Sequence, residues 1–139
     1  MQTPKAELLK IGELKTRSGI SVKTIRYYEQ LGLIQSAART EGGFRLFTLE
    51  AIARLAFIKR SQSLGLSLQE IGAILQIHDQ GKLPCKEVKQ KLHAKILEIE
   101  QQIAELQILK TQLISLIDTP PSLSKNQTND VICPIIQHD

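Results

Sequence analysis

The sequence has few aromatic residues and no long apolar run, and these absences exclude several classes of protein. Hydrophobic residues make up 42% of the chain, which is enough for a core. Because the 139 residues include no tryptophan, three phenylalanines and two tyrosines, that core must be mostly aliphatic. No run of about 18 apolar residues occurs, which predicts that no segment spans a membrane. The first ten residues lack the apolar centre of a signal peptide, so we expect a cytoplasmic protein.

Cysteine is scarce, and the motifs of enzymes are missing. The two cysteines, Cys85 and Cys133, lie far apart and do not form a disulfide scaffold. In a cytosolic chain they are expected to bind metal, to react or to have no chemical role. No nucleophile lies beside a base, and neither a glycine-rich phosphate loop nor a plausible pair of catalytic acids is present. The sequence therefore does not predict an enzyme.

The excess positive charge is confined to one part of the chain. The net charge of +4 arises in residues 1–80, which hold 11 Lys and Arg residues against 7 Asp and Glu, whereas residues 81–139 hold 7 of each. Basicity concentrated in this way favours a nucleic-acid partner over a merely solvated surface.

The stretch from Ser21 to Leu33 predicts one short helix. Ser21 can cap its start, and Gly32 can end it. The residues expected to face inward are Val22, Ile25 and Leu31. Those left outside are Lys23, Thr24, Arg26 and Tyr27. A preceding short helix ends near Ser18-Gly19, so the two form a helix-turn-helix pattern whose second helix suits the major groove of DNA.

A small hairpin is predicted next, because residues 34–47 break the helical periodicity. Gly42-Gly43 permits a tight turn, and residues 44–47 can form short β-structure. Arg39 and Arg45 would lie near the tip and flank of this hairpin, which would make a wing. The alternative is a surface loop with solvated arginines.

Two further helices follow the hairpin, whereas residues 1–9 are expected to be a loose leader. Thr48 is expected to cap the first helix. Ser67 and Glu70 resemble a capping box for the second, which should end near residues 78–81.

The longest regular segment follows Pro84 and has the heptad pattern of a coiled coil. Its apolar positions are Leu92, Ile96, Ile99, Ile103, Leu106, Leu113 and Ile117, interrupted only by Lys110. A helix from about residue 84 to 117 would be about 50 Å long, and the same helix of a second chain is the expected partner. The alternative, a core helix within one monomer, needs partner helices that the sequence does not contain.

With its elements in this order, the sequence resembles the mercury-resistance regulator (MerR) family from about residue 10 to 117. The motifs that carry the resemblance are Ile11-Gly12-Glu13-Leu14, Thr24-Ile25-Arg26-Tyr27-Tyr28-Glu29, Leu31-Gly32-Leu33-Ile34, Arg39-Thr40-Glu41-Gly42-Gly43-Phe44-Arg45-Leu46-Phe47, Phe57-Ile58 and Leu64-Gly65-Leu66-Ser67-Leu68-Gln69-Glu70-Ile71. The family usually has tyrosine where this chain has Phe44 and Phe47. We therefore expect the rings still to pack, without a phenol that could reach a phosphate.

The resemblance implies a mainly α fold in three parts. A winged helix-turn-helix DNA-binding domain would span residues 1–80, a long antiparallel coiled-coil dimerisation helix residues 81–118, and an effector-binding loop and tail residues 119–139. Such a homodimer would bind promoter DNA, bend and untwist it, and act with RNA polymerase there.

The resemblance also implies roles for single residues. Those that would face the groove and its phosphates are Lys23, Thr24, Arg26 and Tyr27. The wing residues Arg39 and Arg45 would grip the DNA backbone.

Metal-sensing members of the family have one cysteine at the start of the dimerisation helix and two beyond its end. Cys85 and Cys133 match the first and the last of these, whereas the middle position lacks a thiol. His138 is the best extra ligand, and Asp118 or His78 could add oxygen or nitrogen. This set favours a divalent ion such as zinc, cadmium, cobalt or lead over copper(I).

Three alternatives remain open. The cysteines could be buried packing residues without a chemical role. They could sense oxidants or electrophiles in a regulator of the same family. In a different class of function, the chain could be a coiled-coil adaptor that does not bind DNA.

Overall fold

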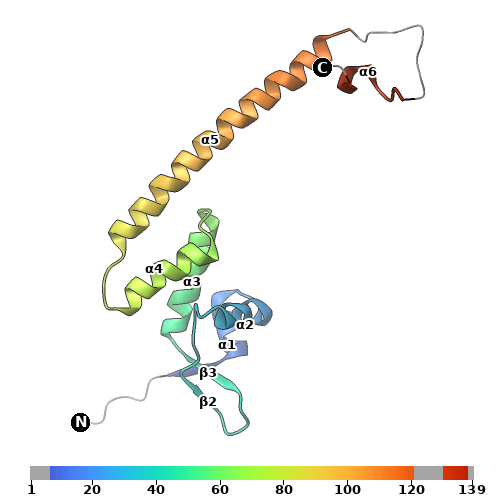
Figure 1. Cartoon of the computed structure of the whole chain (residues 1–139). Coiled ribbons are helices and arrows are strands. Elements are labelled where there is room, and N and C mark those ends of the chain that lie inside the picture. The colour runs from blue at the N-terminus through green and yellow to red at the C-terminus, as the bar shows by residue number, and fades with distance from the viewer. Residues whose placement is uncertain (1–6, 121–129, 138–139) are drawn as a thin grey trace. The chain divides into compact units, whose positions relative to one another are not determined.

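The computed structural model describes residues 7–120 and 130–137, which form a mainly helical chain with one small sheet (Figure 1). The chain divides into two units, residues 1–92 and 93–139, and the division falls inside the longest helix.

The first unit carries the predicted helix-turn-helix and wing. Its elements are β1 (Leu8–Lys10), α1 (Ile11–Ser18), α2 (Val22–Gln30), β2 (Ala38–Arg39), β3 (Arg45–Thr48), α3 (Glu50–Ser63), α4 (Leu68–Asp79) and the first turns of α5 (Cys85–Asp118). The strands form an antiparallel sheet in the order β1-β3-β2. The two helix pairs and the hairpin between them were all indicated by the sequence, and their order is confirmed.

Local signals set the ends of these helices. The Ser21 hydroxyl accepts the Thr24 backbone N–H at 3.2 Å and caps α2, while Gly32 follows the helix with a left-handed φ of 77°. At α4 the Ser67 hydroxyl accepts the Glu70 N–H and the Glu70 carboxylate accepts the Ser67 N–H, both at 3.1 Å. The predicted capping box is therefore confirmed.

The core of the first unit is aliphatic, as the composition predicts, with two aromatic rings. Its largest fully buried side chains are those of Phe47, Leu9, Leu14, Ile25, Ile34, Leu55, Ile58, Ile71 and Ile74. Tyr28 adds the second ring, and its hydroxyl donates to Gln62 Oε1 at 2.7 Å. This core joins α1, α2, α3 and α4 to one face of the sheet, so it holds α2 and the wing in fixed places.

The expectation of a loose leader is wrong for its last residues. Leu8–Lys10 forms β1, in which buried Leu9 lies directly opposite Phe47 of β3. A three-residue strand is too short to show a clear alternation in the sequence, and its pairing depends on β3, which lies almost forty residues away.

Two details around α2 and α3 also differ from expectation. Thr48 ends β3, and Leu49 occupies the cap position of α3 without a side-chain hydrogen bond. Leu31 is exposed, because α2 ends at Gln30 and the core contact is made one turn earlier by Tyr28.

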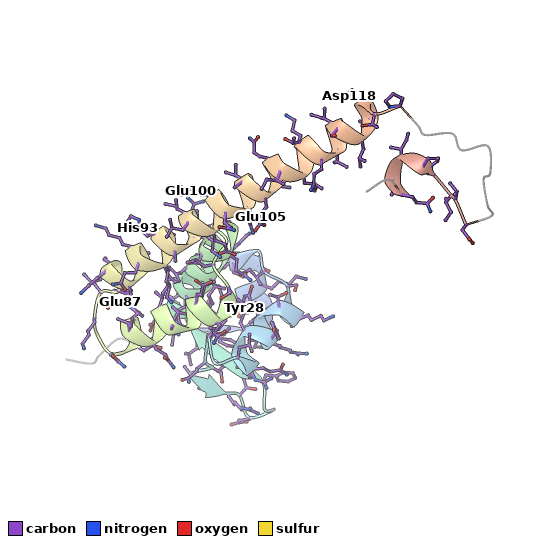
Figure 2. All side chains as sticks on the ribbon, turned by 45° about the horizontal axis from the view of Figure 1, so that its top comes forward. Tyr28, Glu87, His93, Glu100, Glu105 and Asp118 are labelled. Atoms are coloured by element: carbon purple, nitrogen blue, oxygen red, sulfur yellow. The ribbon has the colours of Figure 1, made fainter. Side chains whose placement is uncertain are left out.

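The second unit consists of α5 from residue 93 onward and α6 (Pro134–Gln137). Side chains project from α5 along its length, among them Glu100, Glu105 and Asp118 (Figure 2). No residue of α5 is buried, and the predicted seam is exposed at Ile96, Ile99, Ile103, Leu106, Leu113 and Ile117. Within the described ranges, no helix is long and apolar enough to cross a lipid bilayer.

Candidate functional site

The outer face of α2 carries the residues predicted to meet DNA. Lys23, Arg26 and Tyr27 are exposed, and Thr24 is half-buried. The Thr24 hydroxyl accepts a hydrogen bond from the Ser21 hydroxyl at 2.9 Å, so it is fixed at the start of the helix. Two cations and two hydroxyl groups on a short exposed helix match the donors and acceptors needed in a major groove.

The wing is closed by a turn whose hydrogen bonds converge on Thr40. The Thr40 carbonyl accepts the Gly43 N–H at 2.9 Å, and the Thr40 hydroxyl accepts the Phe44 N–H at 3.1 Å. Gly43 has φ = 83°, which a side chain would strain. This turn presents Phe44, which is 71% exposed. The expected packing of its ring is therefore wrong, whereas Phe47 is fully buried as expected.

The two wing arginines lie across from each other. Arg39 of β2 is paired with Arg45 of β3 in the antiparallel register. This arrangement concentrates positive charge on the wing. It also has a cost, because like charges directly opposite each other destabilise a sheet. Arg45 also forms an ion pair with Glu29 of α2, in which Arg45 Nε lies 2.6 Å from Glu29 Oε1.

A hollow of about 570 Å³ brings these parts together. Its walls are formed by Lys10, Ile11, Gly12, Glu13, Thr16, Arg26, Gly43, Phe44 and Arg45. It therefore joins the start of α1, the exposed face of α2 and the tip of the wing. Three cations and one carboxylate border it, and that carboxylate, Glu13, accepts the Lys10 backbone N–H at 3.3 Å.

Lys10 and Phe44 were not among the predicted contact residues. Lys10 is the last residue of β1, the strand that the sequence did not reveal. Phe44 was expected to pack its ring because the family it resembles usually has tyrosine there. The signal that could have found Phe44 is its place directly after Gly42-Gly43, because a residue at a turn tip has few neighbours to cover it.

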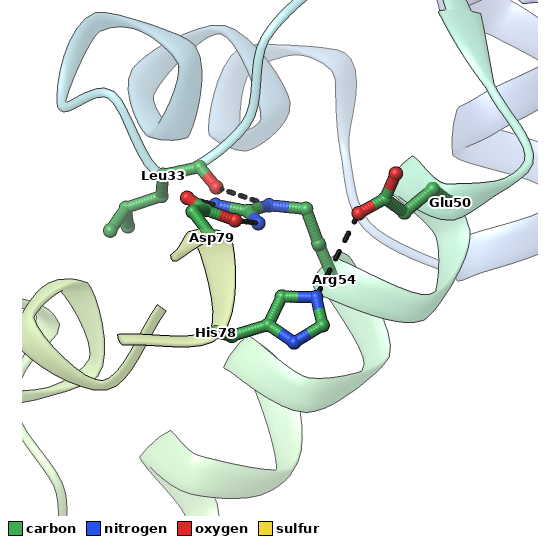
Figure 3. A network of polar contacts seen from close by, with 5 residues as sticks. All are labelled: Leu33, Glu50, Arg54, His78 and Asp79. Carbon is green, nitrogen blue, oxygen red and sulfur yellow. Dashed lines mark hydrogen bonds and ion pairs between the residues drawn. The ribbon is translucent and has the colours of Figure 1, made fainter. Parts of the chain in front are cut away.

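A second polar cluster links the end of α2 to the end of α4 (Figure 3). Arg54 of α3 donates from Nε to the Leu33 carbonyl at 2.9 Å and from Nη1 to Asp79 Oδ1 at 2.6 Å. Nearby, His78 Nε2 lies 3.8 Å from Glu50 Oε1. His78, a candidate metal ligand in the sequence, therefore faces a carboxylate in the first unit.

The cysteines are free thiols in separate parts of the chain. Cys85 is exposed at the first residue of α5, and Cys133 is half-buried just before α6. The Cys133 N–H donates to Gln137 Oε1 at 2.9 Å. His138 lies outside the described residues. Where the structure describes the chain, it contains no group of three or more His, Cys, Asp or Glu side chains that could hold a metal ion.

An exposed cationic helix, a wing and a shared hollow between them define a winged helix-turn-helix DNA-binding protein. The sequence profile of the "MerR HTH family regulatory protein" matches residues 9–77, and that of "MerR, DNA binding" matches residues 52–116. The chain belongs to the MerR family, whose members are transcription regulators and not enzymes.

Three relatives illustrate the similarity. The mercuric resistance operon regulatory protein of Bacillus cereus is 37% identical over 129 residues, which cover 92% of this chain and 94% of the relative. The structure of PbrR691 from Ralstonia metallidurans CH34 in complex with lead(II) aligns with a TM-score of 0.75 and 32% identity over 92% of this chain and 96% of that one. MerR from Bacillus megaterium MB1 in complex with mercury(II) aligns with a TM-score of 0.63, 33% identity and the same coverage.

Proposed function

We propose that this protein is a homodimeric, cytoplasmic transcription regulator that distorts promoter DNA in response to a divalent metal ion bound by its cysteines. The observation that carries the DNA-binding part is the shared hollow. Arg26 of the reading helix and Arg45 of the wing line the same concavity, as two neighbouring contacts to one DNA backbone require.

In this proposal, α2 enters the major groove and the wing lies on the sugar-phosphate backbone. Lys23, Thr24, Arg26 and Tyr27 form the groove face, while Arg39 and Arg45 meet phosphates. The α2 side chains would also meet phosphates at the edges of the groove, so most of the six contacts fix the position of the protein and few read bases. Specificity then comes partly from how readily the promoter sequence deforms. The deformed promoter is the form on which RNA polymerase would act.

The exposed seam of α5 supports a homodimer. Six large aliphatic side chains that follow a heptad spacing are exposed in one chain. Pairing with the same helix of a second chain would cover them and would place two reading helices at a set separation. The lysine at position 110 falls on this seam and would weaken its middle.

The effector part of the proposal rests on the donor atoms and on the relatives. Thiolates suit divalent ions such as zinc, cadmium, cobalt, lead and mercury(II), and two of the relatives described above contain lead(II) or mercury(II). Cys85 and Cys133 are the proposed ligands, with His138 and Asp118 as candidates to complete the set between two chains. A bound ion would cross-link the segments that carry these ligands.

Thiol chemistry without a metal is the second candidate, because Cys85 is exposed and not in a disulfide. Peroxide treatment separates the two, since a metal sensor should not need oxidation to respond. The adaptor alternative is set aside, because the family match covers the helix-turn-helix.

Salt-dependent DNA binding tests the central claim. A duplex is first selected by the parent protein from a random-sequence pool, and its affinity is then measured by fluorescence anisotropy at several salt concentrations. Arg26→Ala should weaken binding about tenfold and reduce the salt slope by about one, whereas Arg60→Ala, an exposed arginine on α3, should change neither. If no duplex is selected, or if Arg26→Ala binds like the parent protein, the assignment of α2 is wrong.

A further inference from the structure

An acidic residue lies between the two elements of the proposed DNA-binding surface. Glu29 is on α2, the proposed reading helix, and its carboxylate oxygen Oε1 is 2.6 Å from Nε of Arg45 on the wing. The Glu29 side chain is 17% exposed, whereas that of Arg45 is 40% exposed. The contact therefore links two DNA-binding elements through a largely covered carboxylate.

The geometry of the guanidinium group decides what this contact does. Arginine carries five donors in a rigid planar fork. A carboxylate oxygen 2.6 Å from Nε anchors the inner end of the guanidinium group and limits where the fork can go, which leaves the two terminal nitrogens for another acceptor. Arg45 itself borders the hollow that Lys10, Arg26 and Phe44 also line.

Electrostatics in the free protein also favours such a partner for Arg45. Arg45 lies opposite Arg39 in the register of β2 and β3. Without a nearby anion, the two cations would repel each other and the Arg45 side chain would sample other rotamers. Glu29 offsets this repulsion from the side of α2, so the wing and the reading helix are joined before DNA arrives.

We infer that Glu29 is a positioning residue for DNA binding, because it holds Arg45 in the orientation in which its terminal nitrogens meet a backbone phosphate. This inference rests on the proposed function, since it names how one phosphate contact is preorganised. It predicts a change in DNA affinity opposite to the one that simple charge removal would cause. Removal of a negative charge from a DNA-binding surface ordinarily strengthens binding, because DNA is a polyanion. Removal of the Glu29 charge should weaken it.

The test is a double-mutant cycle on the selected duplex, using the full-length protein. Glu29→Gln should weaken binding about fivefold and reduce the salt slope by about one, as Arg45→Ala should. In the Arg45→Ala background, Glu29→Gln should cause no further loss, because the residue it positions is already absent. Arg45→Lys should not restore full affinity, since an ammonium lacks the fork.

Glu41 supplies the matched control. It is an exposed acid in the turn of the same wing, so Glu41→Gln removes the same charge from the same region. This variant should bind as tightly as the parent protein or more tightly. Thermal unfolding followed by circular dichroism checks that the variants are folded. Glu29→Asp, which keeps the charge but shortens the side chain, should also weaken binding and serves if Glu29→Gln does not fold.

The outcomes separate this inference from the proposed function. If the parent protein shows no salt-dependent binding, both are overturned. If the parent binds but Glu29→Gln binds equally well or better, the positioning role alone is overturned. An equal loss from Glu29→Gln in the parent and Arg45→Ala backgrounds would likewise show that Glu29 does not act through Arg45.

Discussion

Tyr27 and Tyr28 are consecutive in α2 but face opposite environments. Tyr27 is 50% exposed on the proposed groove face, whereas Tyr28 is 5% exposed and donates its hydroxyl to Gln62 at 2.7 Å. Their ring centroids are 6.3 Å apart. Successive side chains of a helix point about 100° apart, so Tyr27 can face the solvent, where DNA would bind, while Tyr28 packs in the core.

The two tyrosines should therefore respond differently to loss of the hydroxyl. Tyr28→Phe should lower the free energy of unfolding by about 1 kcal/mol, because a partly buried hydrogen bond to Gln62 is lost. Tyr27→Phe should leave stability unchanged and weaken DNA binding. Urea unfolding and anisotropy titration on the same preparations measure the two effects. Equal stability loss in both variants would contradict the division of roles.

The pH dependence of stability should report Tyr28. Burial raises the pKa of Tyr28 above its ordinary value of 10.0, and the side-chain hydrogen bond between Tyr28 and Gln62 opposes this only in part. The folded state therefore keeps the proton at a pH where the unfolded state has begun to lose it. The resulting stabilisation of the neutral phenol is complete below pH 10.0 and is lost as the pH rises through the folded-state pKa. Unfolding of the parent protein and Tyr28→Phe from pH 8 to 11 should show a difference in stability that shrinks at the alkaline end. A constant difference would contradict burial of this hydroxyl.

The strand near the N-terminus should contribute to stability. Leu9→Ala should lower the free energy of unfolding by about 2–4 kcal/mol, because Leu9 is fully buried opposite Phe47. Leu8→Ala is the matched control, since Leu8 is exposed on the other side of the same strand and should change stability by less than about 1 kcal/mol. Chemical denaturation measures both. Similar small effects would mean that β1 does not pack as described.

The seam of α5 should control the oligomeric state. Ile103→Glu should dissociate the dimer, because it would place a charge between two apolar helix faces. Lys110→Leu should strengthen the dimer by completing the heptad series. Gln112→Glu, which lies off the seam, should change neither. Sedimentation equilibrium measures all three, and a parent protein that is monomeric at micromolar concentration would overturn the coiled-coil interface.

Anaerobic metal titration should identify the effector class. Zinc, cadmium, cobalt, lead and mercury(II) are added separately to the parent protein, and thiolate-metal absorption in the ultraviolet is followed. We expect absorption that needs both cysteines and is lost in the double variant Cys85→Ser, Cys133→Ser. Copper(I) serves as the contrasting ion. A double variant that still changes its DNA affinity on addition of a divalent metal would exclude the cysteine site.

The sequence indicates the parts of this fold that are specified locally. Ser21 and Gly32 bound α2, and Ser67 with Glu70 starts α4, because a cap acts within a few residues of its own helix end. These signals place α2 and its exposed cations correctly. The heptad series likewise predicts α5, since a repeat over several turns is read directly from spacing.

What the sequence does not reveal depends on contacts between distant segments. The pairing of Leu9 with Phe47 and the ion pair of Glu29 with Arg45 join elements that only the folded chain brings together. The exposure of Phe44 was missed for a similar reason. An aromatic residue in the sequence gives no sign of whether a neighbour covers its ring.

The cluster around Arg54 has a mechanical consequence. One guanidinium group holds both the Leu33 carbonyl, just after the reading helix, and Asp79, the last residue of α4. A displacement of Asp79 is therefore either transmitted to Leu33 or breaks a charge-assisted hydrogen bond. Arg54 of α3 thus couples the loop that follows α2 to the segment that leads into α5, as long as both of its hydrogen bonds persist.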